Sequence, residues 1–137
     1  MRHAHGSFDV KLAPQKPDND ISQAANLTRM TIDKQFHGDL EATSKGEMLS
    51  AMSEDVKNSG VYVAIERVTG TLAGRKGSFA LHHTGLMDRG QPHLTISVVP
   101  DSGTGELKGI SGTMNIIIAP DGKHSYDFEY QLPESAK

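Results

Sequence analysis

The fold is decided by residues 70–112, which read GTLAGRKGSFALHHTGLMDRGQPHLTISVVPDSGTGELKGISG. Apolar and polar side chains alternate along residues 77–87, and Phe79, Leu81 and His83 share one face. A period of two residues is typical of a strand, because successive side chains in a strand point to opposite faces. Glycines flank each apolar segment and mark turns. The stretch, with the β-branched run that precedes it, therefore predicts three antiparallel strands in the middle of the chain.

Two short turns set the expected register of these strands. A two-residue loop at 75–76 places His83 opposite Val68, and a two-residue loop at 89–90 places Ile96 opposite His83. Cross-strand partners share a face. The three strands then agree on one apolar face, unless either turn is one residue longer.

Two ionisable residues, Glu66 and His83, lie on this apolar face about one residue pair apart. A paired carboxylate and imidazole suit general acid–base chemistry, or the polar anchoring of an apolar ligand. The structural alternative is a buried polar pair that completes its own hydrogen bonds. We therefore take Glu66 and His83 as the candidate catalytic or ligand-binding residues.

Three further residues are candidate ligand contacts. Tyr62 and Tyr126 fall on inward positions, where a phenol hydroxyl can bond a ligand. Glu47 joins Glu66 only if a β-bulge at residues 44–46 corrects the phase of the strand over residues 40–52. Without that bulge, Glu47 points to solvent.

The remaining sequence adds five more strands and no long helix. A Pro-Asp-Gly turn at residues 120–122 predicts a hairpin that pairs Met114 with Phe128. Eight strands suffice to close a barrel, which removes exposed sheet edges. We expect an all-β, single eight-stranded antiparallel β-barrel, with a two-sheet sandwich as the alternative. The other strands are expected at residues 3–12, 27–37, 40–52, 107–118 and 123–132.

Composition excludes several classes of function. The net charge is −3 and the basic residues are scattered, so nothing indicates nucleic-acid binding. No apolar run approaches membrane-spanning length, and the N-terminus has no signal-peptide core. There is no cysteine. We expect a cytoplasmic protein with one domain over residues 1–137 and flexible ends at 1–3 and 133–137.

We predict no metal site and no cofactor. His82 and His83 are consecutive in a strand, so their side chains point to opposite faces and do not share an ion. His3 and His5 share a face, but the sequence places them at a frayed terminus.

Three segments resemble a known family. GTLAGRKGSFALHHTG, ISVVPDSGTGELKGISGTM and KHSYDFEYQL look like the small bacterial family catalogued as domain of unknown function 3224. The resemblance covers nearly the whole chain and is most specific at VVPDSGTGELKGISG. It implies a barrel similar to that of allene oxide cyclase, but it brings no established activity with it.

Two functional classes follow, together with a structural alternative. The first is a binding module that holds a small apolar or amphipathic molecule inside the barrel. The second is an isomerase or cyclase that acts on such a molecule with Glu66 and His83. A barrel filled by its own side chains leaves a structural or protein-interaction role. Outward Ile117, Val99 and Leu86 are apolar, which predicts a homo-oligomer, most simply a dimer.

Overall fold

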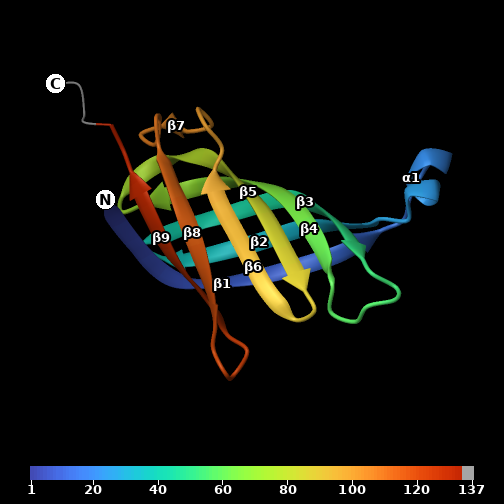
Figure 1. Ribbon diagram of the computed structural model, residues 1–137. Coiled ribbons are helices and arrows are strands. Elements are labelled where there is room, and N and C mark those ends of the chain that lie inside the picture. Colours follow the sequence, from blue (N-terminus) through green and yellow to red (C-terminus); the bar gives the residue numbers. More distant parts are fainter. Residues whose placement is uncertain (134–137) are drawn as a thin grey trace.

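The computed structural model describes residues 1–133 and contains a closed barrel of eight antiparallel strands. Figure 1 shows the strands wrapping around a common interior. Neighbouring strands follow the order β4-β3-β2-β1-β9-β8-β6-β5, and β4 pairs with β5 to close the ring. The predicted all-β barrel is confirmed, and the alternative of two separate sheets is wrong.

The barrel strands are connected mostly by short hairpin turns. They are β1 (Arg2–Gln15), β2 (Thr28–Gly38), β3 (Leu40–Met52), β4 (Gly60–Leu72), β5 (Arg75–Asp88), β6 (Gln91–Val98), β8 (Ser111–Ile118) and β9 (His124–Gln131). A two-residue strand, β7 (Thr104–Gly105), pairs with β5 alone.

A short helix, α1 (Asp20–Ala25), lies in the connection between β1 and β2. Asn19 caps it by accepting a hydrogen bond from the backbone of Ser22. Within residues 1–133, no helix has the length and apolarity needed to cross a bilayer.

The turn of the central hairpin lies two residues earlier than predicted, which shifts the cross-strand partners by four residues. The β4–β5 turn is Ala73-Gly74, so that His83 pairs with Ala64 and not with Val68. Both turn residues have positive φ, 49° and 82°, as a type I′ turn requires. The prediction placed the turn at Arg75-Lys76 because glycines flank these two residues. Because the partners shift by an even number of residues, every side chain stays on its predicted face.

The other two predicted turns are confirmed. Ile96 lies opposite His83 across the Arg89-Gly90 turn. Met114 lies opposite Phe128 across the turn at residues 120–122. These turns bring the apolar positions of β5, β6, β8 and β9 to the inside of the barrel.

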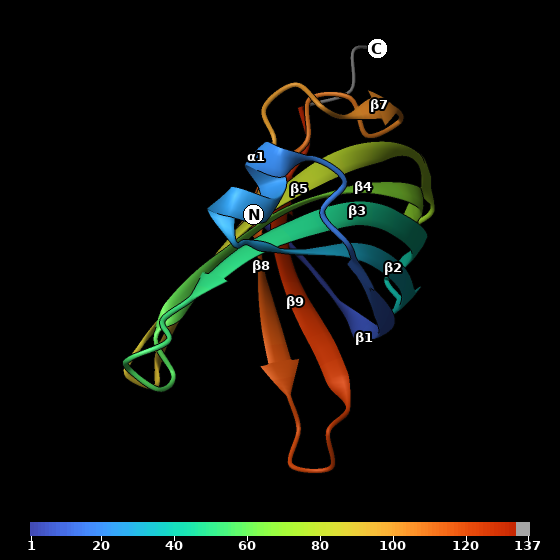
Figure 2. The same cartoon turned by 90° about the vertical axis from the view of Figure 1, so that its right-hand side faces the viewer.

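The core fills one end of the barrel and leaves the other end open. Residues 99–110 fold over the closed end, where Figures 1 and 2 show β7 above the strand ends, and Leu107 and Ile110 are buried there. The prediction of a strand over residues 107–118 is therefore wrong in its first part, since β8 begins at Ser111. At the opposite end, inward positions become exposed: Leu94 is 44% exposed and Met52 is 60% exposed. We call this end the mouth.

The start of β1 and the end of β9 lie near the closed end, as Figure 1 shows. β1 begins at Arg2, inside the segment 1–3 that was expected to be flexible, and Arg2 pairs with Tyr130. Most of the tail predicted over 133–137 lies outside the described residues.

Candidate functional site

A buried cluster of four polar side chains lies inside the barrel, one from each of four consecutive strands. Glu66 on β4 is its centre and is fully buried. Its Oε2 accepts a hydrogen bond from Lys34 Nζ on β2 at 2.9 Å and contacts His83 Nε2 on β5 at 2.5 Å. Its Oε1 accepts a hydrogen bond from the hydroxyl of Ser44 on β3. The carboxylate is therefore held by three partners.

Glu66 and His83 therefore share the inner face, as predicted, and their side chains contact each other directly. Sequence reasoning missed Lys34 and Ser44. The signal was present, because Lys34 alternates with Ile32 and Phe36, both of which are buried. A lysine in such a series reads as an interruption, since lysine is rarely buried without a partner. Its partner comes from a strand more than thirty residues away.

The electrostatics of Glu66 reflect two opposing effects. Burial raises the pKa of the carboxyl group, but hydrogen bonding to His83, the charges of Lys34 and His83, and the Ser44 hydroxyl lower it further. The net pKa is about 2. The Lys34 ammonium also lies 5.0 Å from the ring centre of Phe8 and 5.2 Å from that of Phe36. Glu66 is therefore a fixed anion in this site, not a proton acceptor near neutral pH.

A glycine makes room for this anion. Gly46 on β3 lies directly opposite Glu66 in the register. A Cβ at position 46 would overlap the backbone oxygen of Ile65 and the Cβ of Glu66. The absence of a side chain lets β3 and β4 approach each other where the Glu66 carboxylate turns inward.

Two polar groups beside the cluster have no protein partner within residues 1–133. His83 bonds Glu66 through Nε2, and no hydrogen bond joins its Nδ1 to the protein. No fully buried side-chain nitrogen or oxygen in that range lacks a partner, so Nδ1 remains in contact with solvent. Tyr62 is half-buried, its ring centre lies 6.3 Å from that of His83, and its hydroxyl makes no protein hydrogen bond. Burial, together with the Glu66 charge, raises the pKa of Tyr62.

An apolar hollow of about 330 Å³ opens from Tyr62 to the mouth. The tips of β3, β4, β5 and β6 supply its walls. Gly85 lies directly opposite Tyr62, and a Cβ at position 85 would overlap the Tyr62 ring. The ring can therefore lie flat across β5 only because position 85 is a glycine. The hollow is lined by Met52, Tyr62, Gly85, Met87, Pro92 and Leu94, among others.

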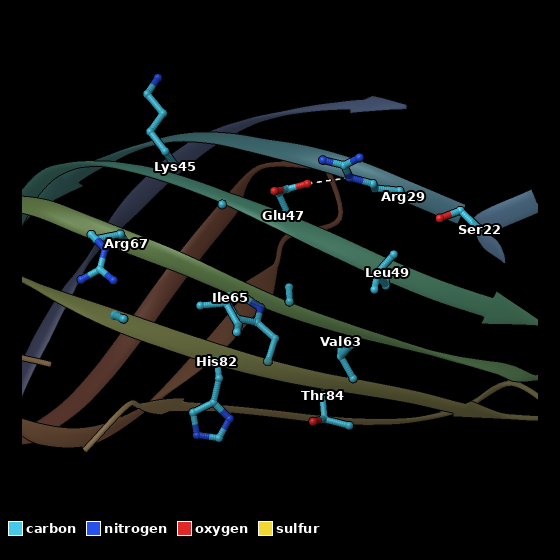
Figure 3. A pocket seen from close by; sticks show the side chains of 14 residues that line it. Ser22, Arg29, Lys45, Glu47, Leu49, Val63, Ile65, Arg67, His82 and Thr84 are labelled. Carbon is cyan, nitrogen blue, oxygen red and sulfur yellow. Dashed lines mark hydrogen bonds and ion pairs between the residues drawn. The ribbon is translucent and has the colours of Figure 1, made fainter. Parts of the chain in front are cut away.

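Glu47 does not join the cluster. β3 pairs with both neighbours in an unbroken register, so there is no bulge at residues 44–46 and Glu47 takes the position expected without one. Glu47 points outward, and its Oε1 accepts a hydrogen bond from Arg29 Nε at 2.7 Å. Figure 3 shows this ion pair on the outer surface, beside Val63 and Ile65. The predicted role of Glu47 in ligand binding stays untested, and any ligand that contacts it would lie on this outer surface.

A second hollow, of about 870 Å³, follows that outer surface over β2 to β5. It is larger than the hollow at the mouth, but the cluster around Glu66 points away from it. His82 and His83 both border it, but His82 is exposed and His83 is buried, which agrees with the prediction that they point to opposite faces. The size of this hollow reflects the curvature of an open surface, so we place the candidate site inside the barrel.

Tyr126 is fixed by the fold at the closed end. Its hydroxyl donates to the backbone oxygen of His37 at 2.9 Å and accepts from the backbone nitrogen of Leu40 at 2.9 Å. Burial is the main cause that raises the pKa of Tyr126. These bonds tie β9 to the β2–β3 turn. The predicted role of Tyr126 in ligand binding stays untested, but its hydroxyl is already engaged by the backbone.

The comparisons with known proteins match the whole barrel. The family model described as a protein of unknown function (DUF3224) matches residues 4–130. A crystal structure of a DUF3224 protein of unknown function from Shewanella oneidensis MR-1 is 48% identical, with a TM-score of 0.88. The match covers 98% of this chain and 99% of that one. No curated protein matches this chain. With a family model over most of its length and a solved relative of nearly equal extent, the chain belongs to the DUF3224 family.

Proposed function

We propose that this barrel binds one small amphipathic molecule at its mouth. The observation that carries the proposal is Tyr62, which lines the apolar hollow and has its ring centre 6.3 Å from that of His83. Within residues 1–133, neither the Tyr62 hydroxyl nor His83 Nδ1 has a protein hydrogen-bond partner. Small-molecule sites combine largely apolar walls with a few converging polar groups. A volume of about 330 Å³ lies at the small end of the usual range for such sites.

The cluster indicates which end of the ligand goes inward. Glu66 fixes one nitrogen of His83, so the other nitrogen is the only position on the ring left for a ligand. If His83 is neutral and donates from Nε2, its Nδ1 accepts a hydrogen bond from a hydroxyl or amide. Tyr62 can donate to or accept from the same polar end. The apolar body would then lie against Met52 and Leu94.

An isomerase or cyclase is the second candidate function. The contact between Glu66 and His83 supports it, because a carboxylate that orients a histidine is a common arrangement for proton transfer. Since the pKa of Glu66 is about 2, His83 would be the base and Glu66 a positioning residue. The expected ligand is the same, so the binding proposal does not depend on this step.

The test exploits two adjacent histidines that point to opposite faces. His83→Gln removes the free Nδ1 of the site, whereas His82→Gln changes the outer surface. We would titrate 1-anilinonaphthalene-8-sulfonate, a fluorescent amphipathic anion, and weigh by native mass spectrometry what remains bound after purification from the source cells. We expect one probe per chain, at least about tenfold weaker binding in His83→Gln, and no change in His82→Gln. Equal affinity in both variants would overturn the proposal.

We also propose that the chain assembles with copies of itself through outer strand faces. Ile117 on β8 is 52% exposed and Leu86 on β5 is 47% exposed, as the sequence predicted. Val99 is partly buried, so it contributes less than expected. The outer face of β4 adds Val63 and Ile65, at 47% and 63% exposure. Apolar side chains grouped on a strand face favour an interface.

A further inference from the structure

We propose that His3, His5 and Asp127 form a divalent-metal site on the outer surface of the barrel, suited to Zn²⁺. Each of the three side chains offers one ligand atom, and these atoms all lie within 4.8 Å of one another. Two imidazoles and one carboxylate are a common donor set for zinc, with room for water to complete the coordination.

Strand pairing holds the three residues in place. β1 runs beside β9, and His5 lies directly opposite Asp127 in the register. Ala4, between the two histidines, is fully buried, so His3 and His5 both point outward. Sequence reasoning rejected the pair as part of a frayed terminus. The structure instead anchors it in a strand that begins at Arg2.

The distances match those between ligands of one metal ion. His3 Nδ1 lies 3.2 Å and His5 Nδ1 lies 3.5 Å from the same atom, Asp127 Oδ1. Ligands about 2.0–2.1 Å from a tetrahedral ion are about 3.3 Å from each other. The two imidazole rings are nearly parallel, with an interplanar angle of 11° and centres 6.0 Å apart. Both rings therefore present the same nitrogen toward one carboxylate, and small ring rotations are enough to close the site.

The charges around the site favour a cation. Asp127 and Glu129 are both on the outer face of β9, and Glu129 lies directly opposite His3. Asp39 lies on the other side of β1, where its Oδ2 accepts a hydrogen bond from the backbone nitrogen of His5 at 2.9 Å. Three carboxylates thus neighbour two imidazoles. Glu129 is the nearest candidate for an outer partner or a fourth ligand by register.

A second group on the same barrel provides an internal control. His37 contacts Asp9 at 3.3 Å and Glu41 at 3.8 Å, so it also places an imidazole among carboxylates. It has only one imidazole, and its donors do not come within the same mutual distance in residues 1–133. Zinc should therefore distinguish the two groups.

The experiment titrates zinc chloride into protein that has been treated with a chelator, using calorimetry. We expect one zinc per chain. His5→Ala and Asp127→Asn should each weaken binding by at least about tenfold, since removal of even an outer partner of a metal site costs that much. His37→Ala should leave the affinity unchanged. The His5 side chain is 65% exposed, so its removal should not unfold the barrel.

Circular dichroism of each variant checks the fold, and His3→Ala replaces any variant that unfolds. Zinc should also raise the melting temperature of the unmodified protein and of His37→Ala, but not that of His5→Ala. The proposal is overturned if zinc does not bind in a one-to-one ratio. It is equally overturned if folded His5→Ala or His3→Ala keeps the original affinity.

Discussion

Glu66 and His83 meet inside the barrel along a diagonal, not as direct partners. Glu66 lies opposite Leu81, and His83 lies opposite Ala64, two positions along the strand. The contact between Oε2 and Nε2 bridges this offset. The contact uses Nε2, so the second nitrogen of His83 has no protein hydrogen bond within residues 1–133. The pair therefore combines a fixed carboxylate with an accessible imidazole.

Replacement of Glu66 by glutamine should strongly destabilise the protein. The change keeps the shape but leaves Lys34 buried without a counter-charge, and a broken buried ion pair costs about 3 to 5 kcal/mol. Urea denaturation measures this loss. Glu47→Gln is the matched control, because that ion pair is exposed and should cost less than about 1 kcal/mol. Equal losses in the two variants would contradict the burial of the Glu66 charge.

The stability of the barrel should fall in acid because of Glu66. Its pKa is about 2 in the folded protein, below the ordinary value of 4.5, so the folded state favours the ionised form. The resulting stabilisation is fully present above about pH 5 and is lost as the pH falls toward 2. It amounts to something on the order of 3 kcal/mol. Denaturation across this range should show a steeper decline for the unmodified protein than for Glu66→Gln. Parallel curves would show that other groups cause the decline.

Two tyrosines that the sequence treated alike should respond differently. Tyr126→Phe removes two backbone hydrogen bonds at the closed end and should cost about 1 to 3 kcal/mol, with little effect on probe binding. Tyr62→Phe removes a hydroxyl that has no protein partner among residues 1–133. It should cost less than about 0.5 kcal/mol but should weaken probe binding. Melting curves and probe titrations of both variants measure the contrast, and the reverse pattern would place the ligand at the closed end.

The residues of the inner face were predictable because the alternation of inward and outward side chains does not change when a two-residue turn is misplaced. The sequence placed the β4–β5 turn two residues too late, yet Glu66 and His83 remained on the inside. A loop one residue longer would have placed Glu66 and His83 on opposite faces. Glu47 shows the limit of this reasoning. Its position depended on a bulge, and the weak alternation of β3 could not decide whether that bulge exists.

The missed parts of the site come from long-range contacts. Lys34 is buried only because Glu66 neutralises it, and no local pattern reveals that partner. The closed end was missed for a related reason. Ile110 continues the two-residue spacing of Met114 and Ile116, so the sequence favoured a strand from Leu107 onward, but Leu107 and Ile110 belong to a turn that folds over the core. Periodicity records that a side chain is buried, but not which element buries it.

Charged substitutions on the outer face should dissociate the proposed oligomer. Ile117→Lys places a charge on the exposed apolar face of β8, and Ile65→Lys places one on that of β4. We expect at least one of them to reduce the mass in solution to that of a single chain, as measured by light scattering. Thr69→Lys, on the outer face of β4 near the closed end, is a control that should leave the mass unchanged. If neither isoleucine variant changes the mass, the proposed interface is wrong.

The closure of the barrel depends on a ladder between the first and last strands. β1 and β9 form seven residue pairs, from Arg2–Tyr130 to Phe8–His124, while β6 and β8 share only the pair Ser97–Thr113. Most of the other ladders are hairpins that can form locally, but the β1–β9 ladder must bring together residues more than a hundred positions apart. The entropy lost in closing so long a loop is recovered only after the ladder zips. We therefore expect the closing of this ladder to limit the folding rate of the barrel. A ligand that bridges β1 and β9 can bind only after the ladder has formed, so it should chiefly slow unfolding.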